Sequence, residues 1–423
     1  MKSKHILFVS YDGMTDSLGQ SQVLPYIKQI SKHNYRYTLI SFEKEDRFLQ
    51  FKDTIIEICK ESNITWIPIK YASKIPIIST IWNVIRLKRK VFSIQRQNPF
   101  DLFHSRSHVP SLVAQMLQKK HQVPYLFDMR GFWADERVDG GVWDLKNPVL
   151  KKVFNFFKRK EIEFIEEANG IVSLTQNGKN EILSWQNMNS APPKLKNKDL
   201  SIEVIPCCVD TELFNINSVN QQKANELKNQ LNIKEDSFVL GYVGSIGTWY
   251  MLPEMLDFFK VLKSKKTKSI FLFITNEPEE KIKSIAIEKG INPKDIKVAS
   301  CLHKEVPTYI SLFDISIYFI LPAYSKKASS PTKQGELMAM GIPIVCNSNV
   351  GDADKIIAEK NSGWVVSNFE EKEYVKITDK ILNEPLPDKY EIIQHGIKEF
   401  NLESGAERFR KTYERILNAG IHN

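Results

Sequence analysis

Cysteine is scarce in this chain of 423 residues, with five at positions 59, 207, 208, 301 and 346. The number is odd, and no two cysteines have the Cys-x-x-Cys spacing. These features disfavour a disulfide framework and a zinc site built from cysteine pairs. We therefore expect the protein to work in a reducing compartment, the cytoplasm.

Long apolar runs are absent as well. The opening Met-Lys-Ser-Lys-His is followed by only four apolar residues, Ile6 to Val9, too few for the core of a secretory signal. No stretch approaches the roughly 20 apolar residues that cross a bilayer as a helix. The formal net charge is +9, which favours acidic partners such as a nucleotide, a membrane surface or a nucleic acid.

Two nucleotide-binding signatures are missing. The loop Tyr11 to Gln22, after the first predicted strand, is neither Gly-x-Gly-x-x-Gly nor a Walker loop, which disfavours a nicotinamide dehydrogenase. The basic residues are scattered and form no stripe with interleaved aromatics. A basic nucleic-acid-binding protein is therefore the less favoured alternative, and we expect no nucleic acid partner.

What the sequence does contain is a repeated alternation of short β-branched or aromatic runs with longer amphipathic stretches. This pattern is typical of a parallel sheet between helices. The predicted strands are 5–9, 37–41, 64–68, 101–104, 124–127, 170–174 and 203–206, then 238–243, 270–274, 296–298, 315–319, 342–345 and 363–366. Because the length exceeds what one core usually supports, the predicted fold class is α/β, with two Rossmann-like doubly wound domains facing a central cleft.

The predicted domains are 1–205, on the acceptor side, and 206–385, on the donor side. The polar stretch 215–223 would bridge them, and helices within 386–423 could cross back to the first domain. Ligands of such sheets bind at the carboxyl ends of the strands. The motifs at those ends therefore carry the functional prediction.

One such motif is the segment Ser329-Ser-Pro-Thr-Lys-Gln-Gly-Glu336. Serine is a strong N-cap and proline favours the first helical position, so we expect a helix to begin here and to end at Gly341. The N–H groups of Thr332 and Lys333, with the helix dipole, would form an anion site. Glu336 lies one turn deeper on the same face as Lys333, where it could accept hydrogen bonds from a ribose. The alternative is a surface Lys–Glu ion pair.

This segment resembles the donor-binding signature of retaining GT-B glycosyltransferases, the family called glycosyl transferases group 1 or family 4. In that family, two glutamates bracket the start of this helix. Glu336 matches the second, which holds the ribose, whereas position 328, where the first contacts the donor sugar, is Ala. Lys333 matches the Pro-x-Lys form of the motif. The resemblance implies donor contacts from Ser329, Ser330, Thr332, Lys333 and Glu336.

The resemblance runs over nearly the whole chain. The loop with Gly19 resembles the family's first glycine-bearing loop, where a glycine lets the backbone approach a phosphate or sugar; a plain strand-to-helix turn is the alternative. Cys301 falls where the family's backbone contacts the base.

The stretch 241–250 resembles the first loop of the family's carboxyl-terminal domain. Many members carry an Arg and a Lys here, whereas this chain has Ser245 and the aromatic pair Trp249-Tyr250. A departing diphosphate still requires charge compensation. We assign this role to Lys333, Arg130 and the N–H groups of Gly247 and Thr248, with Ser245 beside them.

A charged segment, Asp128 to Gly141, follows the predicted strand 124–127. So many charges directly after a buried strand are costly unless they line a cleft. The resemblance puts Asp128 where many relatives carry a histidine that faces the reacting sugar. Asp128, Arg130 and Asp135, together with Lys333, are therefore the catalytic candidates; the alternative is that these Asp–Arg pairs only brace the loop.

The implied activity is that of a hexosyl- or related glycosyltransferase. Such an enzyme moves a sugar from a nucleotide-diphosphate donor to an acceptor hydroxyl with retention, and UDP is one candidate for the nucleotide. The leaving phosphate would assist deprotonation of the acceptor, so no carboxylate pair, metal or cofactor is needed. A glycan or lipid-linked acceptor and a role in cell-surface polysaccharide or glycoconjugate assembly are expected. The alternative is a nucleotide-sugar epimerase or phosphorylase on the same architecture.

Residues 79–97 predict an amphipathic helix. Its core side would carry Ile81, Val84, Ile85, Leu87, Val91, Phe92 and Ile94, and its other side Trp82, Arg86, Arg89, Lys90 and Arg96. A solvated basic face is the common meaning of such charges, but a tryptophan among arginines favours a membrane interface. We therefore predict peripheral attachment to an anionic membrane, on the inner face of the cell membrane, through Trp82, Arg86, Arg89 and Lys90.

Overall fold

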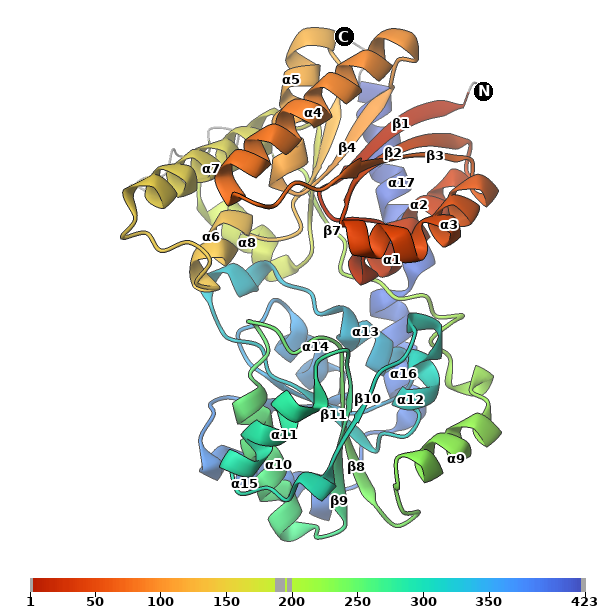
Figure 1. Ribbon diagram of the computed structural model, residues 1–423, viewed down its shortest axis with the longest axis vertical. Coiled ribbons are helices and arrows are strands. Elements are labelled where there is room, and N and C mark those ends of the chain that lie inside the picture. The colour runs from red at the N-terminus through yellow and green to blue at the C-terminus, as the bar shows by residue number, and fades with distance from the viewer. Residues whose placement is uncertain (1–2, 187–194, 196–199, 420–423) are drawn as a thin grey trace. The chain divides into compact units, whose positions relative to one another are not determined.

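The computed structural model describes residues 3–186, 195 and 200–419. The chain divides into two compact units (Figure 1). The first comprises Met1–Pro206, Lys327–Ser329 and Leu402–Asn423, and the second comprises Cys207–Lys326 and Ser330–Asn401. The stretch 215–223, predicted to bridge the domains, therefore lies inside the second unit.

The first unit is built on a parallel seven-stranded sheet of order β3-β2-β1-β4-β5-β6-β7. Its strands are β1 (Lys4–Ser10), β2 (Tyr35–Glu43), β3 (Ile64–Lys70), β4 (Leu102–Arg106), β5 (Tyr125–Asp128), β6 (Gly170–Ser173) and β7 (Ile202–Val204). Its helices are α1 (Ser17–Gln22), α2 (Leu24–Ser31), α3 (Glu45–Glu61), α4 (Pro76–Gln97), α5 (His108–His121), α6 (Trp133–Asp139), α7 (Pro148–Glu167), α8 (Gln176–Ser184) and α17 (Leu402–Ala419).

Side-chain alternation along β4 separates the two faces of this sheet. Ser105 points to α5, where its hydroxyl lies 2.6 Å from that of Ser111. His104 points to the other face, where α17 packs beside α2. Helices α4, α5 and α7 pack side by side on the Ser105 face. Strands β4 and β5 are fully buried and β1 is buried beyond Lys4, because both faces are covered, which explains their near-continuous apolar runs.

The second unit repeats the architecture with a parallel six-stranded sheet of order β10-β9-β8-β11-β12-β13. Its strands are β8 (Phe238–Val243), β9 (Ser269–Ile274), β10 (Ile296–Ala299), β11 (Ile315–Tyr318), β12 (Ile344–Asn347) and β13 (Gly363–Val366). Its helices are α9 (Gln221–Gln230), α10 (Leu252–Lys265), α11 (Glu279–Glu288), α12 (Val306–Ile310), α13 (Thr332–Ala339), α14 (Ala353–Glu359), α15 (Glu371–Asn383) and α16 (Lys389–Phe400).

Both sheets have the doubly wound order in which the first strand lies beside the fourth. The predicted fold class, two Rossmann-like α/β domains, is confirmed, and each predicted strand is present to within a few residues. Only α17 of the last two helices belongs to the first unit, since α16 packs on α13 of the second. Within the described ranges, no helix is both long and apolar enough to cross a membrane.

Helix α4 is present as predicted, but some residues predicted to face the core do not. The buried stripe runs in steps of four through Ser79, Asn83, Leu87, Val91 and Gln95. Polar groups occupy it because they satisfy nearby backbone: the Asn83 amide, for example, donates to the carbonyl of Ala72 at 3.0 Å. The stripe turns Ile81 and Ile85 outward, with exposed fractions of 56% and 37%.

Candidate functional site

Each sheet has one switch point, between β1 and β4 in the first unit and between β8 and β11 in the second. At such a point the chain connections leave in opposite directions, and ligands bind at the carboxyl ends of the strands there. The polar residues of this chain gather at both places. They form two half-sites, one in each unit.

The half-site of the second unit is built around Lys333 in the first turn of α13. Lys333 is 6% exposed, and its Nζ has no hydrogen-bond partner. The Nζ lies 3.7 Å from the ring centroid of Tyr250 and 4.0 Å from that of Tyr242. An amine held only by aromatic faces is an unsatisfied buried donor. This arrangement is not the surface ion pair that the spacing alone allowed.

Glu336 lies one turn farther along α13, and its side chain is 11% exposed. One carboxylate oxygen is 3.6 Å from the Nε2 of His303, a residue of the short helix η3 (His303–Glu305). The His303 ring packs edge-on against Phe214. The carboxylate is thus oriented by a partly exposed imidazole and keeps hydrogen-bonding capacity for a ligand.

The loop after β8 forms the opposite wall of this half-site. Gly244 has φ +110°, a conformation that favours glycine, and a Cβ there would lie 3.2 Å from the Lys333 Nζ. Ser245, Gly247 and Thr248 are exposed, and no atom lies within 4 Å of a Cβ built on Gly247. The predicted residues Ser245, Gly247 and Thr248 therefore lie on one loop, which Lys333 of α13 approaches at Gly244, and the space over Gly247 is open.

The predicted serine N-cap of α13 is wrong. The helix begins at Thr332, and Pro331 occupies the N-cap position without a side-chain hydrogen bond. The Ser330 hydroxyl is directed elsewhere and accepts a hydrogen bond from the Cys207 N–H at 3.1 Å. Ser329 belongs to the first unit, whereas Ser330 and the residues after it belong to the second. Gly341, at φ +71°, ends the helix as predicted.

Cys301 follows β10 in the same loop as His303. Its side chain is partly buried, and burial raises the pKa of its thiol to about 11. The thiol is therefore protonated near neutral pH and inert as a nucleophile. Any contribution of this loop to base binding comes from its backbone and from neighbouring side chains.

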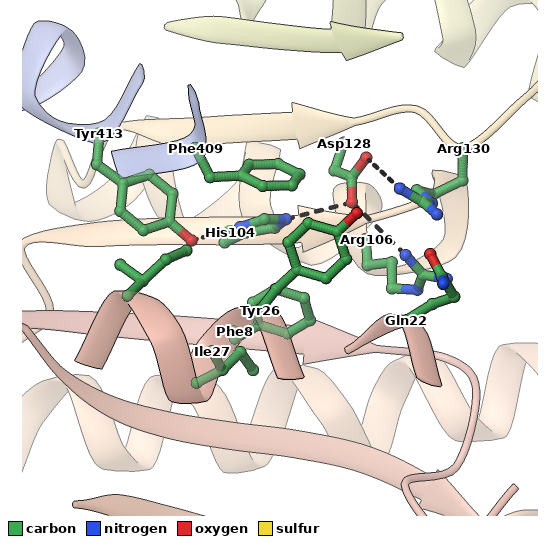
Figure 2. Close-up of a pocket in the computed structure, with 11 residues that line it drawn as sticks. Phe8, Gln22, Tyr26, Ile27, His104, Arg106, Asp128, Arg130, Phe409 and Tyr413 are labelled. Atoms are coloured by element: carbon green, nitrogen blue, oxygen red, sulfur yellow. Dashed lines mark hydrogen bonds and ion pairs between the residues drawn. The ribbon is translucent and has the colours of Figure 1, made fainter. Parts of the chain in front are cut away.

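The half-site of the first unit centres on Asp128 at the end of β5 (Figure 2). Its carboxylate oxygens lie 3.7 Å from Arg106 Nη1, 3.7 Å from Arg130 Nη1 and 3.4 Å from His104 Nε2. Figure 2 shows both arginines on one side of the carboxylate and His104 on the other. His104 in turn lies 2.6 Å from the hydroxyl of Tyr413 on α17. The cluster thus joins three elements of the unit.

Electrostatics keep this cluster charged. Burial alone would raise the pKa of Asp128, but Arg130, His104 and Arg106 outweigh it and hold the pKa below its ordinary value. The cavity beside the cluster has room for about one water molecule, and the Asp128 side chain is 2% exposed. Asp128 therefore acts on Arg106 and Arg130 as a positioning residue, and it does not line an open acceptor pocket in this unit.

Asp135, predicted to be catalytic, lies in a second buried network. It accepts a hydrogen bond from Lys158 at 2.7 Å, and Lys158 also pairs with Glu161. Glu161 accepts from His108 at 2.8 Å. This network ties α6 to α7 and α5, so Asp135 braces the segment after β5, which is the alternative that the sequence left open.

Gly19, predicted to allow close approach of a donor, is explained by packing. A Cβ there would lie 2.2 Å from the carbonyl oxygen of Gly13. The N–H groups of this loop are already occupied, because those of Met14 and Thr15 donate to the Glu43 carboxylate at 2.8 and 3.1 Å. An internal carboxylate thus fills the position that a phosphate takes in glycine-rich loops. The expected donor contact at Gly19 finds no support here.

Several contributing residues were not assigned a role from the sequence. Arg106 stands at the end of a strand beside the switch point, and this position was the available signal. His303 follows a predicted strand in the same way. Tyr413 carried no signal, since it lies 309 residues from the histidine that it contacts. Among the described residues, no cluster of three or more histidine, cysteine or acidic side chains is arranged to hold a metal.

The fold of this chain is the GT-B fold. The solved structures that share it include sucrose-phosphate synthase of Thermosynechococcus elongatus, with TM-score 0.71 and 13% identity over 98% of this chain and 100% of that one. Anabaena HepE in complex with UDP-glucose has TM-score 0.70 and 13% identity over 97% and 99%. A protein described as a UDP-N-acetylglucosamine 2-epimerase from Listeria monocytogenes has TM-score 0.56 and 10% identity over 97% and 95%.

The family match is more specific than the fold. Residues 223–399, almost all of them in the second unit, match the model of glycosyl transferases group 1, so this part of the chain is a group 1 glycosyltransferase domain. No curated protein matches the sequence. Since an epimerase shares the architecture, the fold alone does not separate the two activities; the family match favours the transferase.

Proposed function

We propose that this glycosyltransferase moves a sugar from a nucleotide-diphosphate donor to an acceptor hydroxyl with retention, in the assembly of a cell-surface polysaccharide or glycoconjugate. The observation that carries the donor part is the partnerless Lys333 amine against the glycine turn of the β8–α10 loop. A donor diphosphate on that turn would satisfy the amine, and Glu336 would accept hydrogen bonds from the ribose. Anabaena HepE, which shares the fold, is described with UDP and UDP-glucose, which makes UDP the first candidate carrier.

The chemistry then rests on position and charge. In the proposed mechanism the leaving phosphate takes the proton of the incoming hydroxyl on its own face of the sugar. Lys333, exposed loop N–H groups and the α13 amino-terminus stabilise the charge that grows on that phosphate. This mechanism requires no nucleophile from the half-site of the second unit. Arg130 and Arg106, which are paired with Asp128, supply the positive charge at the half-site of the first unit.

The test begins with nucleotide binding. UDP, GDP and ADP are compared by thermal shift, and a ligand at 100 times its Kd stabilises the protein by about 2.7 kcal/mol. The matching nucleotide sugars are then incubated without acceptor. A transferase leaves the donor intact apart from slow hydrolysis, whereas complete conversion to an epimer would establish the alternative activity. The anomeric coupling constant of the transferred sugar tests retention.

We also propose that the protein attaches to the inner face of the cell membrane through α4, where it would reach a lipid-linked acceptor. The structure gives this helix a larger apolar surface than the sequence suggested. The exposed side chains are Ile75, Ile78, Ile81, Trp82 and Ile85, and exposed Lys74, Lys88, Arg89 and Lys90 lie in the same segment. Arg86 is partly buried and donates to the Lys70 carbonyl at 2.7 Å, so it also braces the helix. Apolar groups beside basic ones match an anionic lipid surface.

A further inference from the structure

The surroundings of the Lys333 amine bear on its charge. Its Nζ is enclosed by the rings of Tyr242 and Tyr250 and by the turn at Gly244. An ammonium group has three N–H donors, and the described structure offers this one no acceptor. The nearest acidic group along α13 is Glu336, one turn away, and that carboxylate is directed to His303.

Two effects oppose each other here. A desolvated cation over an aromatic face gains a modest amount of free energy. Burial of an ammonium without an acceptor costs several times more than that. Burial accordingly lowers the pKa of Lys333 well below its ordinary value, and the influence of Glu336 raises it only in part. The unsatisfied cation is the less stable form in the free protein.

The two tyrosines around the amine carry no charge near neutral pH. Burial raises the pKa of Tyr250 to about 12 and that of Tyr242 well above its usual range, so both remain neutral. Glu277 faces Tyr242, and Cys207 and Glu336 face Tyr250. His303, on η3, faces the Glu336 carboxylate.

We propose that Lys333 is an uncharged amine in the free protein and takes up one proton from solvent when a nucleoside diphosphate binds. The diphosphate supplies the acceptors and the negative charge that the ammonium lacks. No covalent bond changes, and the proton is drawn from water or buffer. This inference rests on the proposed donor site and adds a regulatory property to it: the positive charge appears beside the leaving phosphate only when a donor is present.

The test is titration calorimetry of the full-length protein with UDP, GDP and ADP at pH 8.5, where their phosphates are fully ionised. Each titration is run in two buffers with different ionisation enthalpies, such as Tris and HEPPS. We expect the observed enthalpy to differ between buffers by an amount that corresponds to nearly one proton taken up per bound nucleotide. The uptake should shrink as the pH is lowered, because the free amine then becomes protonated before the nucleotide arrives.

The variant that isolates the amine is Lys333→Arg, since a guanidinium stays charged. It should bind nucleotide with almost no proton uptake, whereas Lys372→Arg, at an exposed position of α15, should behave like the parent. Equal enthalpies in the two buffers for the parent protein at every pH would overturn the inference while leaving the proposed function intact. Undiminished uptake by Lys333→Arg would assign the proton to another group. No binding of any of the three nucleotides would overturn the proposed function and this inference with it.

Discussion

At the scale of single residues, the two half-sites hold their charged groups in opposite ways. Asp128 is a buried anion surrounded by two arginines and a histidine. Lys333 is a buried amine with only aromatic faces around it. A satisfied group fixes its neighbours, whereas an unsatisfied one gains free energy from a ligand. The charges of the first half-site are therefore paired with one another, whereas the second is suited to receive an anion.

Glu336 gives the sharpest prediction at this scale. If its carboxylate holds the ribose, Glu336→Gln should weaken donor and free nucleotide equally, by about 1.5–3 kcal/mol for a charge-assisted hydrogen bond. Calorimetry with both ligands measures the loss.

His303→Gln is the matched control for Glu336→Gln. The pair between the two side chains is 3.6 Å long and the imidazole is 39% exposed, so losing it should cost under about 1 kcal/mol. Unchanged nucleotide affinity in Glu336→Gln would refute the ribose assignment. An equal loss in both variants would mean that Glu336 acts through His303.

At the scale of elements, the hydrophobic pattern located each strand because buried parallel strands read as apolar runs. The same reasoning failed on α4. Asn83 and Gln95 are buried there because each satisfies a backbone group just outside the helix, Ala72 and Phe100 respectively. A helical wheel counts such residues as solvent-facing. The first loop failed for a similar reason, since Glu43 lies 28 residues beyond the Thr15 amide that it occupies.

Helix α4 also carries the membrane prediction. Replacing Lys88, Arg89 and Lys90 with Gln should weaken binding to anionic vesicles by roughly 100-fold, since each basic residue near such a surface contributes about 1 kcal/mol. Replacing Ile78, Ile81 and Trp82 with Ser should remove the part of the binding that persists at high salt. Co-sedimentation over a salt series measures both effects.

The matched control for the basic triple is Lys355, Lys372 and Lys380 to Gln, which removes the same charge from exposed positions of the second unit. The control variant should bind anionic vesicles nearly as tightly as the parent, whereas the α4 triple variant should bind them much more weakly. If both triple variants lose vesicle binding to the same extent, the attraction depends on the net charge of the protein, and α4 is only a solvated surface. Nucleotide affinity should be unchanged in all three variants.

The network between α5 and α7 predicts a pH dependence of stability. Burial would raise the pKa of Glu161, but Lys158 and the hydrogen bond from His108 outweigh it and lower the pKa. A carboxyl whose folded pKa is depressed stabilises the fold above its unfolded pKa of about 4.3. That stabilisation is lost as the pH falls through the folded value.

Glu161→Gln should therefore cost about 3 kcal/mol at pH 7, because it leaves Lys158 buried without its closest charge. The difference from the parent should shrink below about pH 4. Glu163→Gln, on the same helix and 42% exposed, is the control and should cost under about 1 kcal/mol. Urea unfolding over a pH series distinguishes these outcomes; a constant difference at every pH would show that the charge of Glu161 contributes nothing.

At the scale of the whole molecule, the first unit depends on the end of the chain. Phe409 and Tyr413 of α17 pack on His104 of β4, and Ile416 lies so close to Gly170 that a Cβ there would come within 2.8 Å of it. Helix α17 thus covers the face of the first sheet that α5 does not. No local pattern predicts this, because the partners are about 250 to 310 residues apart.

A chain that ends at Asn401 should lose the first unit while retaining the second. Each large apolar side chain left uncovered costs about 1.5–3 kcal/mol, which is a large part of a typical domain stability. Hydrogen exchange should show that β1, β2 and β4 lose protection and that β8, β9 and β11 keep it. A chain that ends at Ala419 should match the parent, and full protection of β1 without α17 would contradict the dependence.

The route of the chain through its units also constrains how such enzymes recombine. The first unit is made from three separate segments, the last of which begins at Leu402. A hybrid with a single junction at Pro206 would place one parent's α17 against the other parent's β4. The hydroxyl of Tyr413 and the ring of His104, which are hydrogen-bonded in this protein, would then come from different parents. The second unit is therefore exchanged cleanly only when 402–423 is inherited together with 1–206.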